Sequence, residues 1–399
     1  MLIYSTLNFE MHIVKSLSVL PPSPLYNFLL IPRLSFFSSF ASLAKNSEVP
    51  NLALSDYLQE TLKFSKTQAL SISTRFSHIR SIEKPQFVVC FFQNLGFSNP
   101  QIQSAVHLTP QILFANIEKS LKPKIKLFQN IGLVGYDLGK FISKNSPLLT
   151  ASLERKLVPR IEILKELLLN DEKNEDLVKV ISRCNWIVHR KPESRLLSNI
   201  AYLKSCGIVG SQLSMLLRRQ PRLFVLQESM LEGLVSRVLN MGFSVNSRMF
   251  VHALYTVSCL SDETFERKFG ILKSFGFSEY ECTLMFRKAP GLLRTSKEKL
   301  KLGMDFFLNI AKFKKEVLLH NPTFVMHSME ERVIPRYKVL QIMKSKKLFK
   351  KEPSFINMLT LTEEEFLQKF ISRFPDDALE LLIAYKGNCL DSSSEGERS

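Results

Sequence analysis

The segment "GIVGSQLSMLLRRQPRLFVL" (residues 207–226) contains the first half of the repeat that predicts the fold. Leu213, Leu216 and Leu217 have the i, i+3, i+4 spacing of a helix with one apolar face. Pro221 ends this helix, because proline disfavours the helical conformation of the residue before it. A short apolar run follows the proline. We interpret the segment as an amphipathic helix followed by a short apolar plug, which we expect to be buried in one tight turn.

The same arrangement recurs along the chain, with a glycine ahead of each proline. The glycine and proline are 14 residues apart at Gly96 and Pro110, Gly207 and Pro221, and Gly276 and Pro290, and 15 apart at Gly132 and Pro147. A second amphipathic segment follows each plug. A single unit of this kind cannot bury its apolar face, so neighbouring units must stack. The sequence therefore predicts an all-α solenoid of about eight units, with a period of roughly 32 to 38 residues, between residues 50 and 345.

The repeat also predicts local details. First helices should end at Thr109, Ser146, Gln220 and Ala289, and the plugs should bury Leu148, Leu149, Leu292 and Leu293. Two degenerate units carry residues 185–187 and 255–257 at the plug position without a proline. In the earliest unit, residues 55–76 should form the first helix and residues 85–96 the second. The repeat array is thus expected over residues 49–345, a helical cap over 346–386, and a disordered tail over 387–399.

The first 48 residues differ from the rest. Residues 1–47 hold nine serines, three basic residues and a single acid, Glu10. A serine-rich, aromatic and nearly acid-free start is typical of organelle transit peptides. A secretory signal is the competing interpretation, but prolines interrupt the apolar stretch. We therefore expect an import segment at residues 1–48, with the mitochondrion favoured over the chloroplast as its destination.

The composition narrows the classes of function. The 399 residues include 54 Lys and Arg against 37 Asp and Glu, a net charge of +17, which favours a polyanionic partner. The six cysteines include no C-x-x-C pair, so we expect reduced thiols and neither a disulfide framework nor a zinc site. No apolar run is long enough to span a membrane. No sequence motif of a catalytic, metal or cofactor site is present, so we expect no enzyme activity and no cofactor.

Six of the candidate binding residues surround two of the repeated prolines. They are Arg218, Arg219 and Arg222 around Pro221, and Arg287, Lys288 and Arg294 around Pro290. Cations at the end of a helix are favourable without any ligand, which accounts for the members that precede the proline. It does not account for Arg222 and Arg294, which follow the break. We therefore predict that these clusters contact phosphates.

Three further candidates, Lys124, Arg160 and Arg336, each follow the proline of a second helix. If that proline opens the helix, the cation lies at the positive end of the helix dipole, where an external phosphate would stabilise it. If the helix begins a turn earlier, the proline only bends it and this argument no longer applies. Both alternatives remain open from the sequence.

These motifs resemble the mitochondrial transcription termination factor family, in particular its plant organellar branch. The resemblance rests on a leading Gly-Phe-Ser, a Pro-x-Leu-Leu helix end and a Leu-x-Pro-Arg start, as at residues 147–149 with 157–160 and 322–324 with 333–336. The closing stretch at residues 364–385 is also similar to the end of that branch. The resemblance covers roughly residues 50–386 and implies a half-ring superhelix with a basic concave face, organelle targeting and nucleic-acid binding.

The favoured interpretation is a monomeric protein that binds organellar double-stranded DNA and regulates transcription, through termination or a related step. An RNA binder that acts in organellar intron splicing or RNA maturation is the first alternative. A protein-interaction scaffold is the second alternative, but a scaffold has no need of so large a basic excess.

Overall fold

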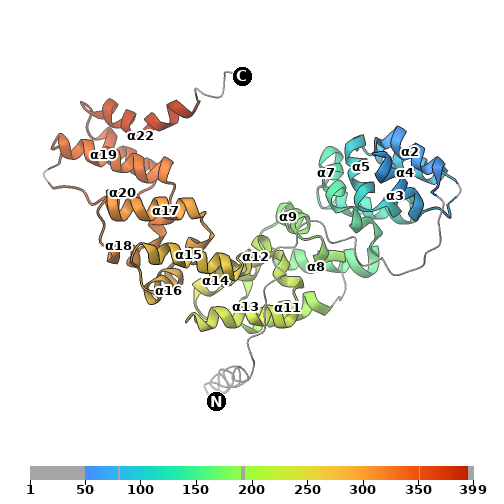
Figure 1. The fold of residues 1–399 in the computed structure, drawn as a ribbon, viewed down its shortest axis with the longest axis horizontal. Helices are drawn as coiled ribbons and strands as arrows, with labels where there is room; N and C mark the ends of the chain where they lie inside the picture. The colour runs from blue at the N-terminus through green and yellow to red at the C-terminus, as the bar shows by residue number, and fades with distance from the viewer. Residues whose placement is uncertain (1–49, 80, 190–193, 350, 394–399) are drawn as a thin grey trace, which may run out of the picture.

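The computed structural model describes residues 50–79, 81–189, 194–349 and 351–393 of the chain. All regular secondary structure in these ranges is helical. The helices stack in chain order into an open arch, with the early units at one end, α11 to α13 near its base and α19 to α22 at the other end (Figure 1). The predicted transit segment, residues 1–48, lies outside the described residues. The architecture is therefore the predicted α-solenoid.

In the described part of the chain, eight helix pairs form the array. The first helices are α3 Lys66–Arg75, α5 Asn99–Leu108, α7 Gly135–Asn145, α9 Glu175–Arg183, α12 Gly210–Arg219, α14 Arg248–Cys259, α16 Glu279–Lys288 and α18 Lys315–His320. The second helices are α4 Glu83–Asn94, α6 Lys122–Asn130, α8 Val158–Leu167, α11 Ser194–Ser205, α13 Glu228–Asn240, α15 Asp262–Ser274, α17 Lys297–Asp305 and α19 Ile334–Ser345. A further helix, α2 Leu52–Leu62, precedes the first pair.

Short plugs join the two helices of most units. They are the 3-10 turns η2 Pro110–Phe114, η4 Ser146–Thr150, η6 Pro221–Val225, η7 Pro290–Arg294 and η9 Pro322–Met326, with the short helix α10 Trp186–His189 in the fourth unit. The four leucines predicted as plugs, at positions 148, 149, 292 and 293, are at most 1% exposed. The plug fills the space between a helix pair and the neighbouring unit, so it contributes to the continuous core.

The helix before each plug ends where the sequence predicts, because the residue before the proline leaves the helical region. Thr109, Gln220 and Ala289 have φ near −140° and ψ of 67° to 76°. In α7, too, the last helical residue, Asn145, directly precedes the predicted end, but Ser146 keeps helical angles (φ −55°, ψ −25°) and already belongs to the 3-10 turn. Cys184 adopts φ −148° and ψ 74° although no proline follows it. Packing of the plug thus imposes this conformation even where proline does not.

Two predictions about irregular units are wrong. The sixth unit has no plug, because α14 runs unbroken through residues 255–257, and Thr256 and Val257 are buried on the helix itself. In the earliest unit, residues 55–76 form two helices rather than one. α2 ends at Leu62, the left-handed φ of 57° at its C-cap Lys63 turns the chain, and Ser65 then caps the start of α3 with a capping box.

Three second helices that carry a proline near their start, α6, α8 and α19, begin with a π turn, whereas α4, with Pro85 at its third position, does not. These turns are η3 Ile117–Leu121, η5 Leu153–Leu157 and η10 Met329–Val333, capped by Asn116, Ser152 and Ser328. Proline has no N–H, and its ring displaces the carbonyl group four residues before it. The turn therefore widens, and its backbone hydrogen bonds join residue i to residue i−5. One such bond runs from Leu121 N to Asn116 O at 3.1 Å. The helix therefore starts a turn before the proline, which decides between the two alternatives left open by the sequence. A π turn at the other end, η8 Phe306–Ile310, extends α17.

The array ends in a helical cap made of α20 Phe355–Thr360, α21 Glu363–Leu367 continued by η11 Gln368–Ser372, and α22 Ala378–Ser393. Thr362 and Glu365 form a capping box at the start of α21. α22 continues to Ser393, so the tail prediction is wrong for residues 387–393. Residues 394–399 lie outside the described part of the chain.

Candidate nucleic-acid interface

The structure separates the nine candidate residues into a buried group and a surface group. The buried group consists of Lys124, Arg160 and Arg336, which are 7%, 7% and 1% exposed. Lys124 Nζ donates to the carbonyl oxygen of Leu149 at 2.6 Å and to Ser120 Oγ at 3.0 Å. Its ammonium thus faces the plug of the next unit, and desolvation by burial lowers its pKa.

Arg336 shows the same arrangement at the end of the array. Its guanidinium donates to the carbonyl oxygens of Met358 at 2.6 Å, Leu361 at 2.8 Å and Thr362 at 3.2 Å, and it lies 4.5 Å from the centre of the Phe366 ring. Desolvation by burial lowers its pKa. Arg336 therefore fastens the last repeat to the cap.

Other second helices supply a donor to the next unit in the same way. Lys268 Nζ donates to Leu293 O at 2.5 Å and Thr295 O at 2.7 Å, Asn199 Nδ2 to Leu226 O at 3.0 Å, Lys299 Nζ to Met326 O at 2.9 Å, and Arg332 Nη2 to Leu359 O at 3.0 Å. We call these side chains, together with Lys124 and Arg336, the inter-unit donors. They satisfy carbonyl groups that a 3-10 turn or a helix end leaves without an intrahelical partner.

The buried group therefore corrects a sequence-based expectation. Lys124 and Arg336 bind carbonyl oxygens rather than facing an external phosphate, and Arg160 is buried at the equivalent position of α8. The physical reason is the π turn, which moves these residues away from the start of the helix and into the inter-unit contact. Lys268, Lys299 and Asn199 have the same role without a preceding proline, so the proline motif could not have identified them.

The surface group lies at the ends of first helices, where the structure links one unit to the next. Arg183 Nη1 donates to the carbonyl oxygen of Arg218 at 2.6 Å, and Lys288 Nζ donates to that of Leu319 at 2.9 Å. Gln220 Nε2 likewise reaches Ser258 O at 3.1 Å. Each donor meets the carbonyl end of the following first helix, and for the cations Arg183 and Lys288 this is a favourable position. The Lys288 side chain thus has a structural role besides any ligand, whereas Arg218 takes part through its main-chain carbonyl.

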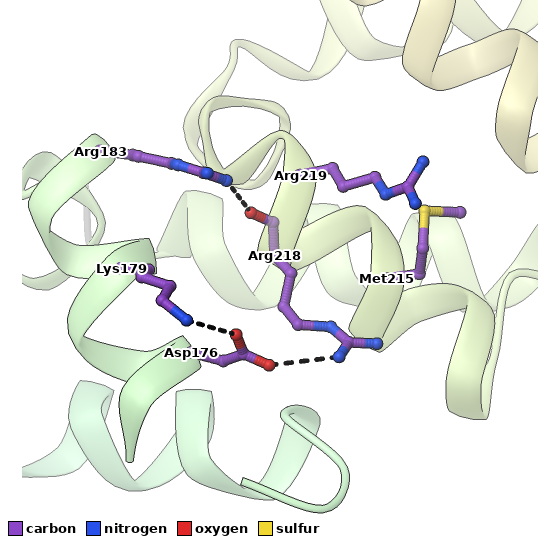
Figure 2. Close-up of a pocket in the computed structure, with 6 residues that line it drawn as sticks. All are labelled: Asp176, Lys179, Arg183, Met215, Arg218 and Arg219. Carbon is purple, nitrogen blue, oxygen red and sulfur yellow. Dashed lines mark hydrogen bonds and ion pairs between the residues drawn. The ribbon is translucent and has the colours of Figure 1, made fainter. Parts of the chain in front are cut away.

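A basic cleft of about 260 Å³ lies between α9 and α12 (Figure 2). It is lined by Asp176, Lys179, Arg183, Met215, Arg218 and Arg219. Asp176 lies between two of the cations, with Oδ2 3.2 Å from Arg218 Nη1 and Oδ1 3.8 Å from Lys179 Nζ. One carboxylate thus faces four cations, and the cleft keeps an excess of positive charge. Sequence reasoning missed Lys179 and Arg183, because nothing in the motif places α9 beside α12.

The other surface candidates differ in exposure. Arg219, Arg222 and Arg287 are exposed, and among the described residues none of them lies within ion-pair distance of a carboxylate. Arg294 is half-buried, donates from Nη1 to Thr256 Oγ1, and lies 4.5 Å from the centre of the Tyr255 ring. Arg219 lies 5.8 Å from the centre of the same ring. Arg219 and Arg294, from units on either side of the sixth, therefore converge on α14.

The described residues include no group of three His, Cys, Asp or Glu side chains placed to hold a metal ion. No helix in the described ranges has both the length and the apolar character that crossing a membrane requires.

Comparison with known proteins agrees with this architecture. The family model described as mTERF matches residues 89–172, 145–273 and 256–367, which together cover 279 (residues 89–367) of the 399 residues. A relative from Arabidopsis thaliana, named transcription termination factor MTERF8, chloroplastic, is 22% identical over 193 residues, which are 48% of this chain and 38% of that protein. The match thus spans less than half of the relative's length. With three overlapping matches across more than half of its length and a solenoid of helix–plug–helix units, the chain belongs to the mTERF family.

Proposed function

We propose that this protein binds double-stranded DNA in an organelle and regulates transcription there, through termination or a related step. Family membership supports organellar nucleic-acid binding, and the name of the Arabidopsis relative supports a role in transcription. Binding would occur without catalysis or cofactor, by one copy of the chain.

The observation that carries the proposal is the set of exposed cations at the ends of two first helices, α12 and α16, which are separated by one unit. Arg219 and Arg222 lie at the junction of α12 and η6, and Arg287 lies near the end of α16. No carboxylate of the described residues neutralises them. Phosphate contacts of such side chains release counterions from the nucleic acid, and this release supplies sequence-independent affinity. A chain with net charge +17 is suited to this mode of binding.

We place the protein in an organelle by virtue of its family and of the serine-rich segment at residues 1–48, proposed as a cleaved transit peptide. The sequence favoured the mitochondrion, whereas the name of the Arabidopsis relative favours the chloroplast. Import of the full chain fused to a fluorescent protein, scored against markers of both organelles, distinguishes the two destinations.

RNA and DNA both present phosphates to a basic surface, so the choice between them rests on a direct test. The tagged full chain would be recovered from purified organelles with its bound nucleic acid, which is then treated with DNase or RNase and sequenced. Recovery of DNase-sensitive duplex from defined loci supports the proposal. Recovery of RNase-sensitive material alone would replace it with the RNA-maturation role, and recovery of protein partners without nucleic acid would replace it with the scaffold.

A further inference from the structure

The absence of a plug leaves the sixth unit unlike the other repeats between the second and the eighth. α14 carries Tyr255 where other units carry the proline, and the Tyr255 ring is half-buried on the helix surface. Arg219 approaches this ring from the last turn of α12, and Arg294 approaches it from the end of η7. Two guanidinium groups from different units thus meet on one face of α14.

α14 itself adds two more basic groups to this face. His252 lies one turn after Arg248 and three residues before Tyr255, so the i, i+3 and i+4 relations of a helix bring them together. Arg248, Arg219 and Arg294 all act on the His252 imidazole and, after desolvation by burial, lower its pKa below 6.5. Arg219 and Arg294 thus share the Tyr255 ring, and the helical spacing places Arg248 and His252 on the same side of α14.

No negative charge balances this group among the described residues. Among the described residues, no carboxylate lies within ion-pair distance of Arg219, Arg248 or Arg294. Arg218, by contrast, pairs with Asp176. The first turn of α14 contains no acidic residue to offset the cation at its positive end. Like charges held together in this way raise the free energy of the folded chain, and a bound anion would offset that cost.

We propose that Arg219, Arg248, Arg294 and His252 form a binding site for one phosphate group of a polynucleotide backbone, which we call the α14 site. The site rests on the proposed function and locates a principal phosphate contact within it. Guanidinium groups match the geometry of phosphate oxygens and can bind them with paired hydrogen bonds. The Tyr255 ring and Thr256 Oγ1 hold Arg294 in place, so less side-chain entropy is lost when the phosphate binds.

The site predicts a proton linkage that a merely structural cluster would not show. The charges that act on the pKa of His252 are Arg219 from α12, Arg294 from η7 and Arg248 from α14, all of them cationic. α13 and α16 also pack against α14, and among the described residues they add no charge to this set. A bound phosphate places negative charge beside the imidazole and raises its pKa. Binding should therefore take up a proton, and affinity should rise as the pH falls below about 6.5.

The test uses the full chain and a fluorescein-labelled 30-base-pair DNA duplex, with binding followed by anisotropy. The variant Arg248→Ala should bind about tenfold more weakly than the wild type, because a charge-assisted hydrogen bond is lost. Its slope of log K against log salt should be lower by about 0.9. Arg267→Ala is the matched control, since Arg267 is an exposed arginine on α15 that pairs with Glu263 and has the same change of charge. Thermal melting of both variants checks that the fold is retained.

The pH arm compares the wild type with His252→Gln between pH 7.5 and 5.5. The wild type should gain affinity on acidification and the variant should gain less. If Arg248→Ala behaves as Arg267→Ala does while the wild type binds duplex, the α14 site is wrong and the proposed function stands. An unchanged pH response in His252→Gln would also overturn the site as described. If the wild type binds neither this duplex nor an RNA of equal length, the proposed function itself fails, and the site with it.

Discussion

The ammonium of Lys268 lies 2.7 Å from the carbonyl oxygen of Thr295 and so joins the sixth unit of the array to the seventh. The same relationship, a donor on a second helix and a carbonyl at the end of the next plug or of the cap helix α20, recurs from Lys124 to Arg336. Solenoid stability depends on interfaces between nearest neighbours, so these inter-unit donors are expected to set how cooperatively the array unfolds.

Replacing Lys268 by methionine should destabilise the protein by about 1–3 kcal/mol, because the carbonyl groups of Leu293 and Thr295 would lose their buried donor. Urea unfolding followed by circular dichroism measures the change. Lys301→Met on α17 is the control, since Lys301 is exposed and should change stability little. Equal midpoints for the two variants would show that the Lys268 contact contributes nothing to stability.

Leu292→Ala should cost about 2–5 kcal/mol, because the plug leucine is completely buried and its removal leaves a cavity. Damage should appear first in the sixth and eighth units, which flank the altered plug. Hydrogen exchange read by mass spectrometry resolves this order. Uniform loss of protection along the whole chain would contradict a nearest-neighbour array.

Stability should fall as the pH drops below about 6.5, and His327 should account for part of the loss. Desolvation by burial, and then Arg332, Arg336 and Lys299, lower the pKa of His327 below 6.5. The unfolded chain therefore binds a proton at a pH where the folded chain does not, and stability rises with pH through this window. His327→Gln should flatten the dependence of the melting temperature on pH between 7 and 5. A dependence identical to that of the wild type would show that His327 is not responsible.

Replacing both Arg219 and Arg222 by alanine should weaken binding roughly equally for all DNA sequences and lower the salt slope by about 0.9 for each lost contact. The fold should survive, because both side chains are exposed. Anisotropy titrations against several duplexes measure the effect, with melting curves from the same samples. A loss confined to one sequence would instead indicate base readout.

The sequence predicted the architecture well, because glycine, proline and helical spacing act locally. Gln220 and Ala289 end their helices as expected, since the following proline alone suffices to do so. Tyr255 was placed wrongly in a plug, because without a proline the stretch is equally compatible with a continuing helix, and packing decided the outcome.

The candidate site was less accessible to sequence reasoning. Lys124 and Arg222 look alike as basic residues beside a proline, yet one is buried against Leu149 and the other is exposed. Whether such a residue faces solvent depends on its contacts with the next unit of the array. For Lys124 this contact joins residues about 25 positions apart in the sequence. The convergence of Arg219, Arg248 and Arg294 depends on three units at once, so no local motif contains it.

The central claim is that the chain binds polynucleotide through its backbone charge, and the salt dependence of binding tests this claim most directly. With roughly 6–10 phosphate contacts, affinity of the full chain for duplex DNA should fall about 10³–10⁵-fold between 50 and 200 mM salt. Tight binding that changes little over this range, or no binding at 50 mM salt, would contradict the account.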